Sequence, residues 1–179
     1  EALARIDTGL AVIVAGRLGL PVPMMADLPE VTPSPALSQI GRQWPVDGRQ
    51  IGILTSRNTP VGEVAGLVAA VDAEGMVPLV VGESGGKLGG EGGVPISRTY
   101  DTARSIEFDA IVVADAPARY EVETLLAEAF HHRKAIAVLG GMEAVQIDLA
   151  APGVIELDSL AGAVDKLLPL LREHRVWER

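Results

Sequence analysis

The glycine-rich stretch at residues 82–93 is the first place in this sequence where phosphate chemistry could be sought. Seven of its twelve residues are glycine, and Lys87 follows a pair of glycines. A phosphate-binding loop has the pattern G-x-x-x-x-G-K-[ST] before a helix, because its backbone N–H groups and its lysine surround the phosphates. Here Val81 stands in place of the first glycine and Leu88 in place of the hydroxyl residue. We therefore interpret the stretch as a flexible loop, followed by a strand-like segment at residues 94–97.

The three histidines are the next residues that could do chemistry. His131 and His132 are adjacent on an expected helix, where successive side chains point about 100° apart, so one metal ion cannot easily bind both. His174 stands alone near the end of the sequence. Because a helix C-terminus favours positive charge, we interpret the two adjacent histidines, with Arg133 and Lys134, as surface or capping residues. The sequence predicts no metal site.

A nucleophile for covalent catalysis is also hard to find. The chain has no cysteine, which excludes a thiolate nucleophile, a thiolate metal site and disulfides. The strand-to-helix turn at residues 139–143, where G-x-S-x-G enzymes carry a serine, reads LGGME. The sequence alone pairs no two acidic residues at acid–base distance, and helix capping explains several of them. Four of them lie near expected strand ends: Asp109, Asp115, Glu143 and Asp158.

Composition excludes further classes of function. Acidic residues outnumber basic ones 24 to 15, and aromatic residues make up 3% of the chain, which argues against nucleic-acid binding. No apolar run is long enough to span a membrane, and the run at residues 10–15 lacks the basic segment that precedes a signal peptide. We expect a cytoplasmic protein with no nucleic-acid or membrane partner. Because the sequence starts at Glu1 without methionine, in a helix-like pattern, we expect a piece of a longer protein.

Two segments must position these residues. Residues 1–48 have a helical pattern over residues 1–20, with Gly19 suited to end the helix, and then a proline-rich stretch that predicts an extended linker. Residues 49–179 alternate apolar runs with helical periodicity. Four apolar side chains could hold the linker against a surface: Met24, Met25, Leu37 and Trp44.

The alternation in residues 49–179 predicts an α/β fold. Expected strands cover residues 50–55, 76–81, 109–114, 135–139 and 154–157, and expected helices cover residues 60–73, 120–132, 142–149 and 159–171. Continuously apolar strands separated by helices indicate a mostly parallel sheet covered on both faces. Pro78 predicts an edge or an irregularity in the second strand. We expect a three-layer flavodoxin-like sandwich whose site would lie at the carboxyl ends of the strands.

Residues 105–116 (SIEFDAIVVADA) and residues 128–139 (EAFHHRKAIAVL) resemble the ThiJ/PfpI branch of the class I glutamine-amidotransferase-like fold. More specifically, they are similar to the C-terminal domain of large-subunit haem catalases of the hydroperoxidase II type. The preceding sequence adds to the likeness, because GRLGLPVP and then SPALSQI before GRQIGILT resemble the end of a catalase core and its linker. The resemblance covers nearly the whole chain.

This resemblance implies a vestigial site. ThiJ/PfpI hydrolases carry a cysteine, followed by histidine, at the turn after the strand that corresponds to residues 135–139. The resemblance places Gly140 at the nucleophile position and Gly141 at the histidine position. The acidic residue that these enzymes carry after the first strand falls near Pro60, with Glu63 one turn further along. The resemblance therefore implies no catalytic residue and no cofactor in this chain.

For the whole protein, the resemblance implies a catalase that converts hydrogen peroxide to water and oxygen at haem. This chain would be a non-catalytic accessory domain that stabilises the parent, with the catalase core of the same chain as its partner within a homotetramer. Tyr100 and Tyr120 lie in contexts unlike a haem-ligand helix. One alternative is a chaperone-like module for unfolded client proteins, or a small-molecule-binding module, that reuses the vestigial pocket. A less favoured one is an active ThiJ/PfpI-type hydrolase or glyoxalase.

Overall fold

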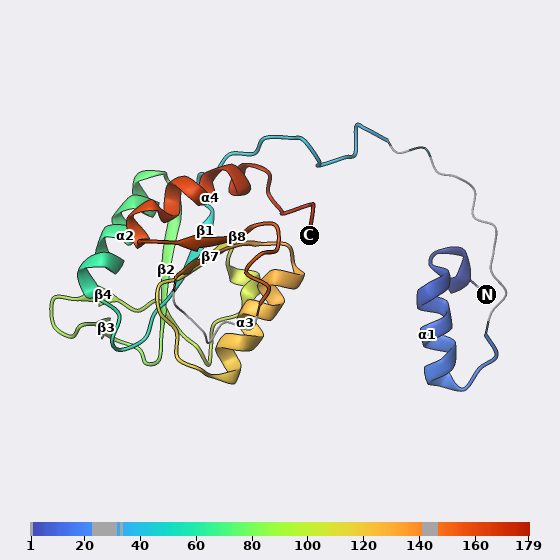
Figure 1. Ribbon diagram of the computed structural model, residues 1–179, viewed down its shortest axis with the longest axis horizontal. Helices are drawn as coiled ribbons and strands as arrows, with labels where there is room; N and C mark the ends of the chain where they lie inside the picture. Colours follow the sequence, from blue (N-terminus) through green and yellow to red (C-terminus); the bar gives the residue numbers. More distant parts are fainter. Residues whose placement is uncertain (1, 23–31, 33, 141–146) are drawn as a thin grey trace. The chain divides into compact units, whose positions relative to one another are not determined.

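The computed structural model describes most of the 179-residue chain, namely residues 2–22, 32, 34–140 and 147–179. Its internal contacts divide the chain into two compact units, Glu1–Gln39 and Ile40–Arg179. The helices of the first unit lie within residues 3–18, whereas the described part of the second unit contains the strands and three α-helices (Figure 1).

The helical unit contains two segments where the sequence predicts one. A 3-10 helix, η1, covers Leu3–Arg5, and the α-helix α1 covers Thr8–Leu18. Asp7 interrupts them because its backbone is extended, with φ of −152°, and its carboxylate accepts the Leu10 N–H at 2.9 Å as an N-cap. Gly19 ends α1 in the left-handed conformation, as predicted, with φ of 66°.

The described residues between 20 and 49 contain no helix or strand, as the proline-rich sequence predicts. Trp44 is half-buried in the second unit, whereas the side chain of Leu37 is exposed. Met24 and Met25 lie outside the described residues. Of the four side chains expected to hold the linker, Trp44 is therefore the one with a visible packing role.

The main sheet has six parallel strands in the order β5-β2-β1-β6-β7-β8. Their bounds are Gln50–Leu54 (β1), Val77–Gly82 (β2), Arg98–Thr99 (β5), Ala110–Val113 (β6), Ala135–Leu139 (β7) and Val154–Leu157 (β8). Without β5, the order is that of flavodoxin-like folds, so the fold prediction is confirmed. The two-residue strand β5 was not predicted.

Helices cover both faces of this sheet, as predicted (Figure 1). Helix α2 (Val61–Ala73) and helix α4 (Ala163–Arg172), which follows the 3-10 helix η3 (Leu160–Gly162), pack on one face. Helix α3 (Tyr120–His131) packs on the other, beside the 3-10 helix η2 (Ser105–Glu107). Strand residues alternate between the two cores: Ile51 and Ile53 of β1 face α2 and α4, whereas Leu54 faces α3.

Pro78 lies on an open edge, which agrees with the sequence-based expectation. Strand β5 pairs only with Val81 and Gly82, so it does not reach Pro78. The N–H of the neighbouring Val77 donates to the carbonyl of Arg49, the residue before β1, at 2.8 Å. Because successive residues of a strand point their N–H groups in opposite directions, an N–H at position 78 would point away from β1, toward the side that β5 does not reach. The missing N–H of Pro78 therefore costs no sheet hydrogen bond.

Two other expectations differ from the structure. Part of the predicted flexible loop forms an antiparallel hairpin, in which β3 (Lys87–Leu88) pairs with β4 (Val94–Pro95). The expected helix at residues 142–149 falls largely on residues 141–146, which lie outside the described residues, and residues 147–149 are not helical. Pro60 precedes α2 as an extended N-cap residue and is not itself part of the helix.

Candidate functional site

Three polar residues meet at the carboxyl edge of the sheet, where the sequence predicts a site. Ser56 follows β1, Glu83 follows β2 and Asp115 follows β6 shortly after the strand ends. Strands β1 and β6 are neighbours, and chain order reverses between them, which makes this edge the topological switch point. Asp115 was a sequence candidate, whereas Ser56 and Glu83 were not. Their signal is that each is polar and lies within two residues of the end of an apolar strand.

Ser56 is held by several hydrogen bonds. Its hydroxyl donates to a carboxylate oxygen of Asp115 and accepts the Asn58 N–H at 3.0 Å. Its own N–H donates to the Thr59 hydroxyl at 2.8 Å, and that hydroxyl donates to the Ser56 carbonyl at 3.0 Å. The arrangement closes the loop after β1 on itself and leaves its hydroxyl proton committed to Asp115.

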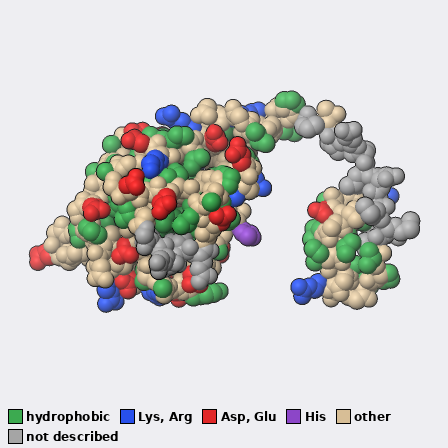
Figure 2. Space-filling model, in the orientation of Figure 1, with side chains coloured by type: hydrophobic (Ala, Val, Ile, Leu, Met, Phe, Trp, Pro, Cys, Tyr) green, Lys and Arg blue, Asp and Glu red, His purple; other side chains and the backbone are tan. Residues whose placement is uncertain are grey.

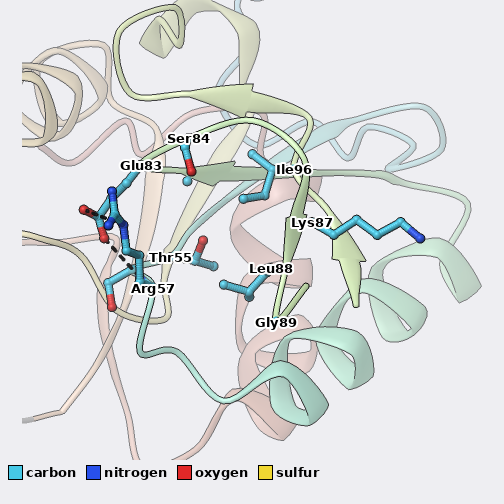
Figure 3. A pocket seen from close by; sticks show the side chains of 10 residues that line it. Thr55, Arg57, Glu83, Ser84, Lys87, Leu88, Gly89 and Ile96 are labelled. Atoms are coloured by element: carbon cyan, nitrogen blue, oxygen red, sulfur yellow. Dashed lines mark hydrogen bonds and ion pairs between the residues drawn. The ribbon is translucent and has the colours of Figure 1, made fainter. Parts of the chain in front are cut away.

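A small cavity of about 110 Å³ lies beside this loop, between the ends of β1 and β2 and the β3–β4 hairpin (Figure 3). Glu83 accepts the Arg57 N–H at 3.1 Å, and its other oxygen lies 3.6 Å from the Arg57 Nε. The Lys87 side chain extends away from the other labelled side chains (Figure 3). The Glu83 carboxylate therefore already accepts the Arg57 N–H that could otherwise bind an anion. The Lys87 amine does not point toward this N–H group.

Gly89 explains why this hairpin needs glycine. Its φ is +79°, and a Cβ atom there would collide with the Val61 side chain at the start of α2. Only glycine combines this backbone conformation with so close an approach to the helix. The glycine-rich stretch therefore lines the cavity and packs on α2, and it contributes few polar side chains to the cavity.

The histidines lie away from the Ser56–Asp115 pair. His131 and His132 are exposed at the C-terminal end of α3, and His174 follows α4. In an α/β sandwich these helices run back to the amino edge of the sheet, opposite the carboxyl edge. A serine nucleophile needs an adjacent base that takes its proton. Among the described residues, Ser56 has a carboxylate partner but no histidine partner, so it is not part of a Ser–His–Asp triad.

The predicted vestigial turn follows β7. Gly140 donates its N–H to the Leu157 carbonyl at 2.8 Å, and its φ is not in the left-handed region. A Cβ atom at this position would lie 3.4 Å from a Glu156 carboxylate oxygen and 3.4 Å from the Leu157 carbonyl. No described residue would therefore exclude a small side chain. Gly141 lies outside the described residues.

Glu63 lies near this turn, in a groove beside α2. The groove has a volume of about 590 Å³, and Glu63 lines it together with Leu139, the residue before Gly140. Asp158 and Ser159, which follow β8, line its other side. Pro60 does not line it. The structure thus brings one of the two acidic-region positions to the end of β7, in a groove whose described lining residues include no sulfur-containing residue and no histidine.

Neither tyrosine fits the haem that the resemblance implies for the whole protein. A tyrosine ligand of haem is a phenolate, but burial raises the pKa of Tyr100 well above its usual range, and its hydroxyl donates to the Thr55 carbonyl at 2.8 Å. Tyr120 lines a cavity of about 190 Å³, which is smaller than a pocket for a drug-sized ligand. Among the described residues, no cluster of three or more histidines and carboxylates could hold a metal ion.

Lys134 is not the surface residue that the sequence suggested. Its side chain is buried, and its amine donates to the carbonyls of Ser105 and, at 2.6 Å, of Phe108. It therefore caps the end of η2, which packs beside α3, and does not cap α3 itself. Arg133 is exposed, as expected, and donates to the Trp177 carbonyl at 2.5 Å.

Comparisons with known proteins agree with this architecture. A family model described as the C-terminal domain found in long catalases matches residues 47–179. The chain is 31% identical over 194 residues to catalase HPII of Pseudomonas putida and 30% identical over 193 residues to catalase HPII of Pseudomonas aeruginosa, in both cases over 100% of this chain and 27% of the relative. It is 35% identical over 158 residues to catalase HPII of Mycobacterium avium, over 77% of this chain and 21% of the relative.

The chain thus spans about a quarter of the length of these curated relatives. No helix within the described ranges is both long and apolar enough to cross a membrane. The match extends over the whole α/β unit from residue 47, and the relatives align with the helical unit as well. The chain therefore belongs to the family of C-terminal domains found in long catalases.

Proposed function

We propose that this chain is a non-catalytic accessory domain that stabilises a large-subunit catalase, whose core decomposes hydrogen peroxide to water and oxygen at haem. The observation that carries the proposal is the state of the carboxyl edge. Ser56 and Asp115 are hydrogen-bonded to each other, as are Arg57 and Glu83, and the position that the resemblance assigns to a nucleophile is Gly140, which has no side chain. Polar groups that satisfy one another hold loops in place but activate no substrate.

The helical unit supports the proposed partner, the catalase core of the same chain. Among the described residues of this unit, only small side chains are buried, namely those of Ala4, Ala11 and Ala15. Larger apolar side chains are exposed, including Ile6, Ile13 and Leu18 at 77%, 62% and 66%, and Figure 2 shows such side chains over much of this unit. A helix that is apolar around most of its circumference is typical of one buried in a larger structure. We propose that the core covers it within the parent homotetramer.

The proposal is tested in the full-length catalase. The double variant Ser56→Ala/Asp115→Asn should leave the initial rate of peroxide decomposition unchanged, because the pair takes no part in the reaction. Lys134→Met should leave the initial rate unchanged but shorten the half-life of activity at elevated temperature, because the buried lysine stabilises the domain. The matched control is Lys166→Met, since Lys166 is exposed. Loss of initial rate in the double variant, or an unchanged half-life in Lys134→Met, would overturn the proposal.

A cysteine at Gly140 tests whether an activated nucleophile position survives. Gly140→Cys should fold, because its Cβ has room, but the adjacent Glu156 carboxylate should raise the pKa of the new thiol. Its reaction with a disulfide reagent is measured between about pH 6 and pH 9, around the ordinary thiol value. The reference is Ser84→Cys, at an exposed position. We expect Gly140→Cys to react more slowly than the reference at neutral pH. A faster reaction would indicate that the turn still activates a nucleophile.

A further inference from the structure

The last residues before the sheet are fastened to the α/β unit. We call residues 44–48 the strap. At one end of the strap, the Trp44 N–H donates to the carbonyl of Arg172, the last residue of α4, at 2.7 Å. At the other end, the Gly48 N–H donates to the Gly75 carbonyl at 2.8 Å. Between them, the Pro45 carbonyl accepts from the Arg49 Nε at 3.0 Å. The strap is thus the route by which the chain enters the sheet.

His174 lies where the strap, α4 and the amino edge of the sheet meet. Its Nδ1 atom is 3.1 Å from the Arg49 Nη1, and its ring centroid is 6.2 Å from that of Trp44. The same Arg49 nitrogen is 3.3 Å from a carboxylate oxygen of Asp109, whose other oxygen accepts the Gln50 N–H at 3.0 Å. Arg49 therefore connects the strap, through Pro45, to both His174 and Asp109.

The contact between Arg49 and His174 requires a neutral histidine. A guanidinium can only donate hydrogen bonds, so the Nδ1 atom of His174 must be the acceptor, and its proton must be on Nε2. When the ring is protonated, Nδ1 carries a hydrogen as well, and two donors with positive charge then face each other. The charged groups that act on the ring are Arg49 and the adjacent Arg175, both cations, and the carboxylate of Asp109.

We propose that His174 is a pH-sensitive switch that keeps the strap bound to the domain when it is neutral and releases it when it is protonated. The proposal goes beyond the accessory role, because it assigns the domain a device that controls how the chain enters it. Release would free Trp44 and Pro45 from α4 and Arg49 and would withdraw Val46, which is partly buried against the core, while the sheet beyond residue 50 keeps the rest of that core.

The direction of the pH effect follows from the surroundings of the ring. Burial lowers the pKa of His174, Arg175 and Arg49 lower it further, and Asp109 opposes them. Between this lowered value and the ordinary value near 6.5, the released state binds more protons than the bound state. The strap is therefore fully held above about pH 6.5. Between the two pKa values, the equilibrium constant for strap binding falls about tenfold for each unit by which the pH is lowered.

Trp44 reports release directly. In a Trp177→Phe background, Trp44 is the sole tryptophan, because the chain has two. We expect its emission to shift to longer wavelength on acidification, with a midpoint below about pH 6.5. His174→Asn should abolish the shift, since asparagine tolerates the left-handed backbone at this position (φ of 70°) and offers an acceptor that does not titrate. The matched control, His131→Asn, changes an exposed histidine and should leave the shift intact.

Hydrogen exchange separates strap release from general acid unfolding. Below the midpoint, the protection factor of the Trp44 backbone N–H should fall, whereas that of the Ile53 backbone N–H in strand β1 should not. The proposal is wrong if the fluorescence of the Trp177→Phe protein does not respond to pH, if His174→Asn still shows the transition, or if Trp44 and Ile53 lose protection together.

Discussion

Replacing Lys134 with methionine should lower the free energy of unfolding by about 1–3 kcal/mol, because the buried Phe108 carbonyl would lose its lysine donor, whereas the Ser105 carbonyl would still accept the Phe108 N–H at 3.1 Å. The carbonyls belong to Ser105 and Phe108, and both residues are almost completely buried. One unsatisfied buried carbonyl costs roughly 1–3 kcal/mol, and the loss of the second bond to Ser105 adds to this cost while removal of a desolvated charge offsets part of it. The measurement is urea unfolding, compared by midpoint at unchanged slope.

Lys166→Met is the matched control, because Lys166 also donates to a carbonyl, that of Glu156, but in an exposed position. Its effect should stay within about 0.5 kcal/mol. An effect of less than about 1 kcal/mol for Lys134→Met would mean that water replaces the amine, and would contradict the role of Lys134 as the residue that caps η2.

Alkaline pH provides a second test of the same residue. Burial lowers the pKa of Lys134, with Arg175 adding to the effect and with Asp109 and Glu128 opposing it. Between this lowered value and the ordinary value near 10.4, the unfolded chain binds more protons, so this residue makes stability rise with pH. The difference in stability between wild type and Lys134→Met should therefore grow on going from about pH 8 to pH 10. The raised pKa of Tyr100 makes the stability of both proteins fall above about pH 10, and this contribution cancels in the difference between them.

The central sheet could be predicted from the sequence because its strands are apolar on both faces. Strands β1, β6 and β7 are continuous apolar runs. A run of this kind is typical of a strand in the middle of a parallel sheet that is covered on both faces. Strand β5 has no such signal, since Arg98 and Thr99 pair with the carboxyl end of β2 only after the hairpin has turned the chain back. The hairpin is likewise defined by contact with α2, through Gly89, and not by local propensity.

The groups that matter most at the two edges depend on contacts between distant parts of the sequence. Ser56 and Asp115 meet because β1 and β6 are adjacent, and the sequence does not specify that pairing. Lys134 looks like a helix-terminal surface residue until its amine is seen beneath η2. His174 looks isolated, since its partner Arg49 lies 125 residues away. Pattern analysis identifies residue types, whereas pairing requires the strand order.

Glycine at position 52 is the other requirement of the core with a large expected effect. Gly52 lies in the middle of β1, and a Cβ atom there would be 2.9 Å from the Cγ atom of the Phe108 ring and 3.0 Å from its two Cδ atoms. The ring packs flat against the strand backbone and is buried. Gly52→Ala should therefore lower the free energy of unfolding by about 1–3 kcal/mol through overpacking, even though alanine suits a strand better than glycine does.

A double-mutant cycle distinguishes this collision from a general intolerance of β1. Phe108→Leu alone leaves a gap and destabilises, but in Gly52→Ala/Phe108→Leu the new methyl group can occupy part of it. We expect the double variant to be more stable than the sum of the single effects implies, by about 0.5–3 kcal/mol. Gly66→Ala in α2 is the matched control, because its Cβ meets open space, and should stabilise by about 0.5–1 kcal/mol. Additive effects at Gly52 and Phe108 would show that the ring does not determine why this strand requires glycine.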